Sequence, residues 1–177
     1  MVEYIIGGIV GTGATLSNCY SRGSIEINEN DDKDNVWLHI GGLAGKANIN
    51  NSYSTCNIIT NFKYDTYTLY IGGLVGEGNV TKSYATGNII ATFTDTTRLE
   101  YAKIASLTTS YNNENTSAIV DSYYYDEQII DTSGTIIANK TEASMVTIWT
   151  FINKNWDSSI WNLYIDKNPT LKTKEQV

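Results

Sequence analysis

One histidine, His39, is the first candidate for chemistry in this chain. A zinc peptidase helix needs two histidines four residues apart and a glutamate that acts as the base. A chain with a single histidine cannot form that site. We therefore interpret His39 as a strand residue that faces solvent or a loop, rather than as a metal ligand.

The acidic run from Glu26 to Asp34 is the second candidate. It contains Glu29, Asp31 and Asp32, and clustered oxygen atoms are what hard cations such as calcium prefer. The run lacks the glycine at the sixth position and the glutamate at the twelfth that an EF-hand loop requires. A solvated loop is the main interpretation, with a cation near Asp31 to Asp34 left as an alternative. We expect no cofactor and no catalytic metal.

A carbohydrate-active enzyme would need two carboxylates about 5–10 Å apart. Asp65, Asp95 and Glu100 lie in segments between expected strands, but nothing in the sequence brings them together. The chain also lacks a serine nucleophile elbow, a phosphate-binding glycine loop and a reactive Cys–His pair. We expect no catalytic residues, and an enzyme that acts on polysaccharides stays the alternative.

A repeated block dominates the rest of the sequence. Ile-Gly-Gly-Ile/Leu-Val/Ala-Gly begins at Ile6, Ile40 and Ile71, with spacings of 34 and 31 residues, and an eroded copy begins at Ile104. A tyrosine preceded by Ser or Cys follows each block. The residues that recur from unit to unit are Gly7, Gly8, Gly11, Tyr20, Gly41, Gly42, Gly45, Tyr53, Gly72, Gly73, Gly76, Tyr84 and Tyr123. A unit of this length cannot bury its apolar face alone, so the units must stack.

The repeat predicts structural roles for its own residues and a binding role for others. We interpret the glycines as points of close backbone packing at corners, not as a nucleotide loop. The repeat tyrosines are expected to stack on one another as a ladder. Recognition in such folds usually lies in the parts that do not repeat, so the candidate ligand-binding residues are Tyr64, Tyr67, Tyr70 and Tyr101.

Composition restricts the fold class and the partners. The 13 tyrosines and 14 glycines, with one proline, favour short strands over a helical bundle. A net charge of −7 disfavours nucleic acid as a partner, and the apolar runs are too short for membrane insertion. Cys19 and Cys56 stand four positions apart relative to the repeat tyrosine, too far for a disulfide in stacked units, so we expect two free thiols.

The chain divides into a repeat region, residues 1–139, and a capping segment, residues 140–177. Each repeat unit, starting near residue 6, 40, 71 or 104, offers about three short strands. In the capping segment, apolar residues between Thr141 and Trp156 recur at helical spacing, and Trp161 to Ile165 read as a strand. We predict that this segment covers the open end of the stack.

The blocks resemble the GLUG motif, which occurs in tandem in bacterial surface adhesins and beside immunoglobulin A metallopeptidases. The resemblance rests on Ile-Gly-Gly-Leu-Val-Gly followed by Asn/Lys-Ser-Tyr-Ala/Ser-Thr-Gly-Asn-Ile, is clearest from Ile71 to Ile89, and extends from residue 6 to about 130. It implies an all-β fold, a right-handed parallel β-helix of about four coils, closed by a short helix and strand. For activity it implies a non-catalytic region of an extracellular protein.

The expected function is therefore that of a repeat module in a secreted or surface-anchored bacterial protein, acting as an adhesin segment or spacer. Its partner would be a glycan or protein of a host or bacterial surface, and further repeats are expected upstream in a longer parent chain. The localisation expected is extracellular or cell surface. A third interpretation is an intracellular self-assembling or toxin-delivery fragment.

Overall fold

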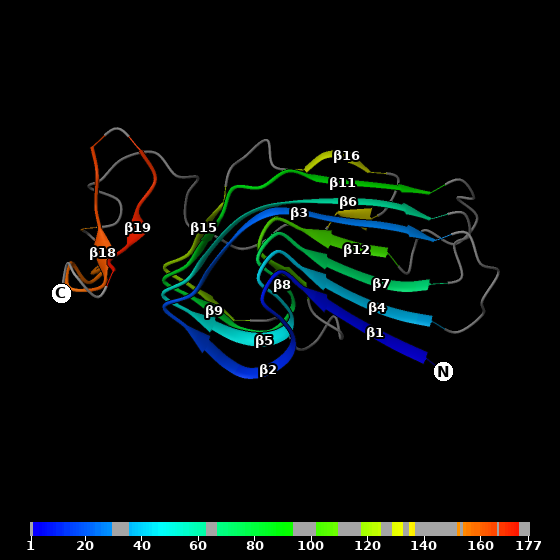
Figure 1. Ribbon diagram of the computed structural model, residues 1–177, viewed down its shortest axis with the longest axis horizontal. Coiled ribbons are helices and arrows are strands. Elements are labelled where there is room, and N and C mark those ends of the chain that lie inside the picture. Colours follow the sequence, from blue (N-terminus) through cyan, green and yellow to red (C-terminus); the bar gives the residue numbers. More distant parts are fainter. Residues whose placement is uncertain are drawn as a thin grey trace.

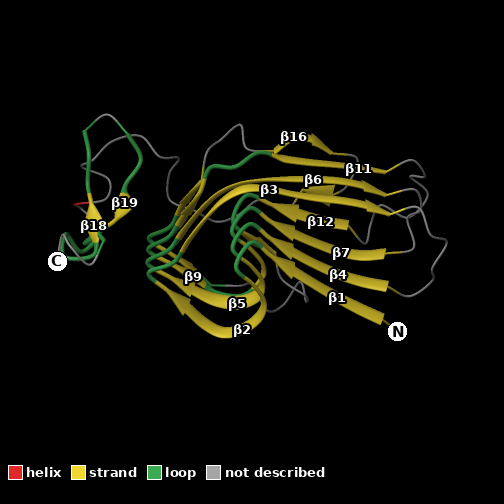
Figure 2. Cartoon of the chain, viewed as in Figure 1, coloured by secondary structure: helices red, strands yellow, loops and turns green. Residues whose placement is uncertain are grey.

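A computed structural model describes residues 2–29, 36–62, 67–93, 102–109, 118–124, 129–132, 135–136, 152, 154–165 and 167–173. Nearly all of the ordered secondary structure in this part of the chain is β-strand, and no helical element longer than one residue is present there (Figure 2). The predicted all-β class is confirmed. Within the described residues, no helix is long and apolar enough to cross a bilayer.

Three sheets with parallel pairing make up the body of the protein (Figure 1). Sheet A contains β1 (Val2–Gly7), β4 (Val36–Gly41), β7 (Tyr67–Gly72), β12 (Ala102–Ala105) and β17 (Thr135–Ile136). Sheet B contains β2 (Val10–Ser17), β5 (Ala44–Asn50), β8 (Val75–Glu77), β9 (Val80–Thr81), β13 (Thr108–Thr109) and β14 (Ile119–Val120). Sheet C contains β3 (Tyr20–Glu29), β6 (Tyr53–Phe62), β10 (Tyr84–Ala85), β11 (Ile89–Phe93), β15 (Tyr123–Tyr124) and β16 (Ile129–Thr132).

Each repeat unit contributes strands to all three sheets, and equivalent residues of successive units pair. Ile6 pairs with Ile40, Ile40 with Ile71, and Ile71 with Ile104. Because the pairing joins each residue to its own equivalent one unit away, the side-chain pattern of one unit is stacked on that of the next.

Two apolar clusters fill the interior. The first lies between sheet A and the later part of sheet C and consists of Val36, Leu38, Ile40, Ile58, Phe62, Leu69, Ile71, Ile89, Ala91, Ala102 and Ile104. The second lies against sheet B and consists of Leu43, Ala44, Ala47, Ile49, Leu74, Val75, Val80, Ala85 and Leu107. The alternation of apolar and polar residues along β4 and β6 places one face of each strand in these clusters.

The repeat glycines lie at the turn from sheet A to sheet B, where backbone meets backbone. A Cβ atom at Gly41 would overlap the carbonyl oxygen of Ala44 and lie 2.6 Å from the Cα atom of Val75 in the next unit. A Cβ atom at Gly76 would lie 2.6 Å from the carbonyl oxygen of Gly45 and 2.8 Å from the amide nitrogen of Ile40. Neither glycine has a positive φ, so these positions require glycine for its small size.

A second corner, between sheets B and C, uses left-handed backbone. In each unit the residue two positions before the repeat tyrosine has a positive φ. The values are 57° for Asn18, 45° for Asn51, 44° for Lys82 and 46° for Asp121. Asn and Asp tolerate this conformation better than other residues that have a Cβ atom, because their short side chains can hydrogen-bond locally. Lys82 is therefore the residue least suited to this corner.

A chain of serine hydroxyls joins the units beside that corner. The Ser52 amide donates to the Ser83 hydroxyl at 3.0 Å, and the Ser83 amide donates to the Ser122 hydroxyl at 3.2 Å. Each hydroxyl in turn donates to a carbonyl two residues earlier in its own unit, as Ser83 does to Thr81 at 2.7 Å. In the first unit Cys19 takes this place, and its amide donates to the Ser52 hydroxyl.

The repeat tyrosines stack as their common position predicts. The rings of Tyr20 and Tyr53 lie 5.1 Å apart at 7°, and those of Tyr53 and Tyr84 lie 4.9 Å apart at 5°. Tyr123 is paired with Tyr84 in the parallel register. Tyr53, Tyr84 and Tyr123 are buried, whereas Tyr20, in the first unit, is 52% exposed.

The C-terminal segment covers this ladder. Trp161 contacts the rings of Tyr53 and Tyr84, while Trp156 contacts those of Tyr84 and Tyr123. The Tyr84 hydroxyl donates to the carbonyl oxygen of Pro169 at 2.6 Å. Residues 154–165 and 167–173 therefore lie along the side of three units, and for this part of the segment the predicted lid over the end of the stack is wrong.

The segment is held by strands and turns where it is described. β18 (Trp161–Asn162) and β19 (Thr170–Leu171) pair antiparallel. Of the predicted helix from Thr141 to Trp156, residues 141–151 and 153 lie outside the described residues. Asn155 has a φ of 53° and its amide donates to the carbonyl oxygen of Ile152, so the chain forms a turn just before Trp156.

The two thiols are free, which confirms the prediction from their positions. Cys56 is buried within β6 and pairs with Gly23 of the preceding unit. Cys19 is partly exposed and its thiol lies 3.2 Å from the carbonyl oxygen of Ser17.

Gly41→Ala tests the close backbone approach. The added methyl group has only backbone atoms to displace, and we expect the free energy of unfolding to fall by about 3 kcal/mol. Gly13→Ala is the matched control, because its nearest neighbour would be Val10 Cγ1 at an ordinary 3.8 Å. Urea denaturation followed by tryptophan fluorescence measures both. Equal stability of the two variants would contradict the proposed role of the turn glycine.

Lys82→Asn tests the left-handed corner. Compared with Lys82→Ala, which equally removes the contact from Lys82 Nζ to the Asn155 carbonyl, the asparagine variant should be more stable by about 1 kcal/mol. Thermal and urea denaturation of both proteins provide the measurement. An alanine variant at least as stable as the asparagine variant would show that the backbone strain is negligible.

Candidate functional site

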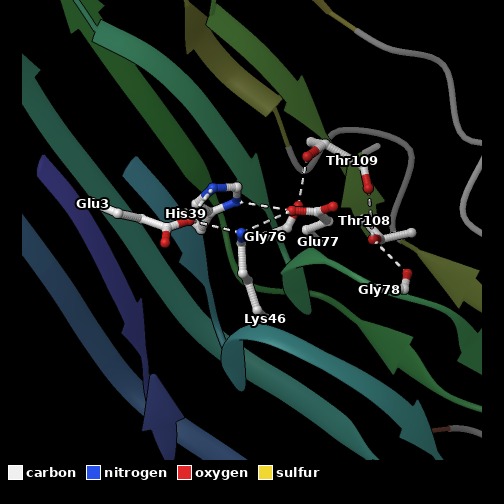
Figure 3. A network of polar contacts seen from close by, with 8 residues as sticks. All are labelled: Glu3, His39, Lys46, Gly76, Glu77, Gly78, Thr108 and Thr109. Carbon is white, nitrogen blue, oxygen red and sulfur yellow. Dashed lines mark hydrogen bonds and ion pairs between the residues drawn. The ribbon is translucent and has the colours of Figure 1, made fainter. Parts of the chain in front are cut away.

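The outward faces of sheets A and B meet at a cluster of ionisable side chains, the polar cluster, formed by Glu3, His39, Lys46 and Glu77 (Figure 3). Glu3 comes from β1, His39 from β4, Lys46 from β5 and Glu77 from β8. Sheet B packs against sheet A here because its strands lack a side chain at Gly45 and Gly76. The repeat glycines thus place the cluster.

His39 lies at the centre of the cluster and is fully buried. Its Nε2 atom lies 3.2 Å from Glu3 Oε1 and its Nδ1 atom 3.4 Å from Glu77 Oε2, although neither contact has hydrogen-bond geometry. Its ring stacks on Tyr70 of the next unit, with centroids 4.7 Å apart at 12°. The interpretation of His39 as a residue facing solvent or a loop is therefore wrong, because sheet B covers the outer face of sheet A at this position.

Lys46 bridges the two carboxylates. Its Nζ atom lies 2.7 Å from Glu3 Oε1 and 3.4 Å from Glu77 Oε2. The hydrogen bond from Lys46 lowers the pKa of Glu3 below its usual range. Burial alone would depress the pKa of Lys46, but the bond to Glu3 and the attraction of Glu77 and Glu3 outweigh burial and raise it. Ionised Lys46 and Glu3 are therefore favoured near neutral pH.

Burial has the larger effect on His39. Burial and, to a smaller extent, the positive charge of Lys46 lower the pKa of the ring to about 4, although the carboxylate of Glu3 partly opposes them. The imidazole is neutral near pH 7, between two carboxylates and one ammonium group.

Aromatic and cationic side chains continue the cluster along sheet A. Trp37 lies 6.5 Å from Tyr70 between ring centroids, and Lys103 of the fourth unit lies 5.6 Å from the Tyr70 ring centre. Tyr70 is only 3% exposed, so it supports the His39 ring from one side and offers little surface to a ligand. The arrangement is a stack of flat groups with charges at its edges.

The fourth unit closes the same row with hydroxyl groups. Thr108 donates to the carbonyl oxygen of Gly78 at 2.8 Å, and Thr109 donates to that of Gly76 (Figure 3). Both threonines are buried. Thr108 pairs with Val75 and Thr109 pairs with Glu77, so the eroded unit has two hydroxyl groups at these positions and uses them to satisfy backbone carbonyls of its neighbour.

The tyrosines predicted to bind a ligand do not form one described site. Tyr64 and Tyr101 lie outside the described residues. Tyr67 begins β7 and pairs with Val36 through its backbone. Tyr70 is buried against His39, which makes it part of the internal stack rather than of a binding surface.

Most of the acidic residues predicted as candidates lie outside the residues that the structure describes. Asp31, Asp32 and Asp34 lie outside the described residues, as do Asp65, Asp95 and Glu100, so the cation alternative and those carboxylates stay as predictions. In the part of the chain that the structure describes, no three His, Cys, Asp or Glu side chains are placed to hold a metal ion.

Sequence reasoning did not single out Glu3, Lys46 or Glu77. A usable signal was present: Lys46 and Glu77 follow the last glycine of their blocks and pair directly, so opposite charges stand at one repeat position in neighbouring units. His39 and Tyr70 likewise share the position before the leading isoleucine. Reading each repeat position down the stack would have predicted both contacts.

No protein family, curated protein or solved structure that was compared with the chain matches it. The resemblance to the GLUG motif therefore rests on the quoted residues alone.

The buried imidazole predicts a pH dependence of stability. The unfolded chain takes up a proton at an ordinary histidine pKa near 6.5, but the folded chain does so only at about 4. Between these two pH values the unfolded state binds more protons than the folded state. The stabilisation of the folded chain by neutral His39 is therefore fully present above pH 6.5 and is lost as the pH falls towards 4. It amounts to about 3 kcal/mol.

The measurement is direct because the chain has one histidine. Proton NMR of the folded chain should give a midpoint near 4 for the ring signal. His39→Phe keeps a flat ring on Tyr70 without titrating, and its urea stability should depend less on pH between 6.5 and 4. A midpoint near 6.5 in the folded protein would contradict the burial of the ring.

Proposed function

We propose that the chain is a non-catalytic repeat module of a bacterial surface or secreted protein, acting as an adhesin segment or spacer. In this proposal the three sheets form a right-handed parallel β-helix, or β-solenoid, of about four coils. At about 4.8 Å per coil the repeat region would provide roughly 20 Å of rigid length. Its partner would be a glycan or protein of a host or bacterial surface, and its location extracellular or at the cell surface.

The in-register stacking of the units is the observation that supports this proposal most. Three sheets, a tyrosine ladder and a serine chain repeat the same contacts in each unit. Residues fixed by such contacts are occupied in holding the stack together. A fold of this kind uses most of its side chains in contacts between units, and this property suits a scaffold that separates or presents other parts of a protein.

The alternative, a carbohydrate-active enzyme, has one observation in its favour. Glu3 and Glu77 both contact Lys46 and flank His39, so two carboxylates do lie close together on the outer face of the sheets. Glycoside hydrolysis, however, needs one carboxylic acid that keeps its proton. The lowered pKa of Glu3 and the ammonium group between the two carboxylates favour a closed ion-pair network instead.

The first test is turnover. The purified chain, incubated with a panel of acidic and neutral polysaccharides, should release neither reducing ends nor unsaturated sugars above background. Activity that disappears in Glu77→Gln but persists in Glu26→Gln, an exposed carboxylate outside the polar cluster, would overturn the non-catalytic proposal.

The second test is binding on a glycan array and to bacterial and epithelial surfaces. If the module is an adhesin segment, the combined change of Tyr64, Tyr67 and Tyr101 to Ala should weaken binding at least about ten-fold, since aromatic side chains often dominate recognition. Tyr164→Ala, outside the repeat units, is the control. Binding by no surface would support the spacer, and equal loss in the control would contradict recognition by the variable tyrosines.

A further inference from the structure

The C-terminal segment meets the stack through an aromatic cluster that is separate from the two interior clusters. We call residues 154–165 and 167–173 the docked segment. The side of the stack that it contacts, the ladder face, is formed by Tyr53, Tyr84 and Tyr123. These tyrosines pack with Trp156 and Trp161, and none of the five residues belongs to the clusters that fill the interior. The contact is therefore an interface on the side of the stack and not a part of its core.

Hydrogen bonding separates the docked segment from the stack in the same way. β18 and β19 form a sheet of their own beside the stack (Figure 1), and among the described residues no backbone-to-backbone bond joins the docked segment to the other three sheets. The bonds that cross the interface there use a side chain. The Tyr84 hydroxyl donates to the carbonyl oxygen of Pro169 at 2.6 Å, and the Trp156 indole donates to that of Asp121 at 3.0 Å. Departure of the segment would break no strand pairing described for the stack.

The docked segment also has contacts that hold its own shape. The Asp157 carbonyl oxygen accepts bonds from the amides of Ile160 and Trp161, at 3.0 and 2.9 Å. The Ile160 carbonyl oxygen accepts a bond from the Lys172 amide at 2.8 Å. These bonds form a turn around Trp161 without any atom of the stack. The turn can therefore present its indole in the same way to any ladder face that it meets.

The chemistry of the ladder face selects a segment of this kind. Trp161 lies 6.1 Å from both Tyr53 and Tyr84 between ring centroids, and Trp156 lies 6.4 Å from Tyr84 and 5.8 Å from Tyr123. The two indoles, 4.6 Å apart, thus bridge three consecutive units. A peptide without two indoles at this spacing would leave part of the aromatic row uncovered. The partner that fits is another copy of the docked segment.

We propose that the ladder face is an exchangeable docking site, which the docked segment of a second copy of this chain can occupy in place of the chain's own. Each copy carries both the ladder face and the segment, so every contact made within one chain can form between two. Exchange of an identical element in this manner is a low-cost route to association. It does not depend on the proposed surface location, since it needs only the described contacts.

Exchange requires that the docked segment opens while the sheets stay folded, and hydrogen exchange of the intact chain measures this. The Trp156 indole proton should have a protection factor at least about ten-fold lower than the best protected amides of β4 and β7. Trp161→Ala should lower that protection by a further factor of about ten and leave those amides unchanged. Equal protection of the indole and of the β4 and β7 amides would overturn the proposal, because the segment would then open only when the whole chain unfolds.

Association is tested with two complete chains that are weakened on opposite sides of the interface. Tethering keeps the effective concentration of a chain's own segment high, so a second copy competes only where the chain's own contact is weak. The acceptor chain carries Trp161→Ala and keeps its ladder face, whereas the donor chain carries Tyr84→Ala and keeps its segment. Mixed in equal amounts, they should form a one-to-one complex with a dissociation constant at least about ten-fold lower than that of either chain with itself. Sedimentation velocity provides the measurement.

Tyr164→Ala in place of the acceptor is the matched control. Tyr164 contacts Lys167 and Thr170 within the docked segment, so this chain keeps its own docking and should bind the donor no better than the unchanged chain does. A circular dichroism spectrum like that of the unchanged chain must accompany each variant. Tyr84→Phe, which removes the bond to Pro169 without a large cavity, is the donor if Tyr84→Ala does not fold. No complex between donor and acceptor, or an equally strong one with the control, would overturn the proposal.

Discussion

Close backbone approach at the Gly-Gly turn is the constraint on which the rest of the structure depends. Gly41 sits against Ala44 of its own unit and Val75 of the next, so the turn fixes both the angle between sheets A and B and the register of neighbouring units. Once that register is set, every other position meets its own equivalent one unit away. The tyrosine ladder, the serine chain and the polar cluster all follow from it.

The parts of the fold that repeat were predictable from sequence for the same reason. Recurrence at a fixed spacing showed that glycines and tyrosines serve the stack, and equal positions predicted equal contacts, as the rings of Tyr20, Tyr53 and Tyr84 demonstrate. Two cysteines at unequal positions likewise implied separate thiols. Periodicity carries this information because parallel in-register pairing brings equivalent residues together.

Features that depend on contact between different parts of a unit were not predictable in the same way. The strand pattern gave no sign that sheet B would cover His39, since the covering surface is created by missing side chains at Gly45 and Gly76. The C-terminal tryptophans were assigned to the end of the stack, yet Trp156 and Trp161 lie along its side. Such packing depends on how well the surfaces of segments far apart in the sequence fit each other, and the spacing of residues within one segment does not encode that fit.

The connections from sheet C back to sheet A stand apart from these contacts. Glu29, Phe62 and Phe93 are equivalent in register, but the next paired residue follows after stretches of different length, as between Phe62 and Tyr67 or between Glu29 and Val36. Among the first three units these connections differ most in length, and in the fourth unit the stretch from Thr109 to Ile119 is also longer than its equivalent from Glu77 to Val80. Foreign peptides grafted between Phe62 and Tyr67 would be displayed from a scaffold whose internal contacts need not change, which makes this connection a natural position for epitope presentation.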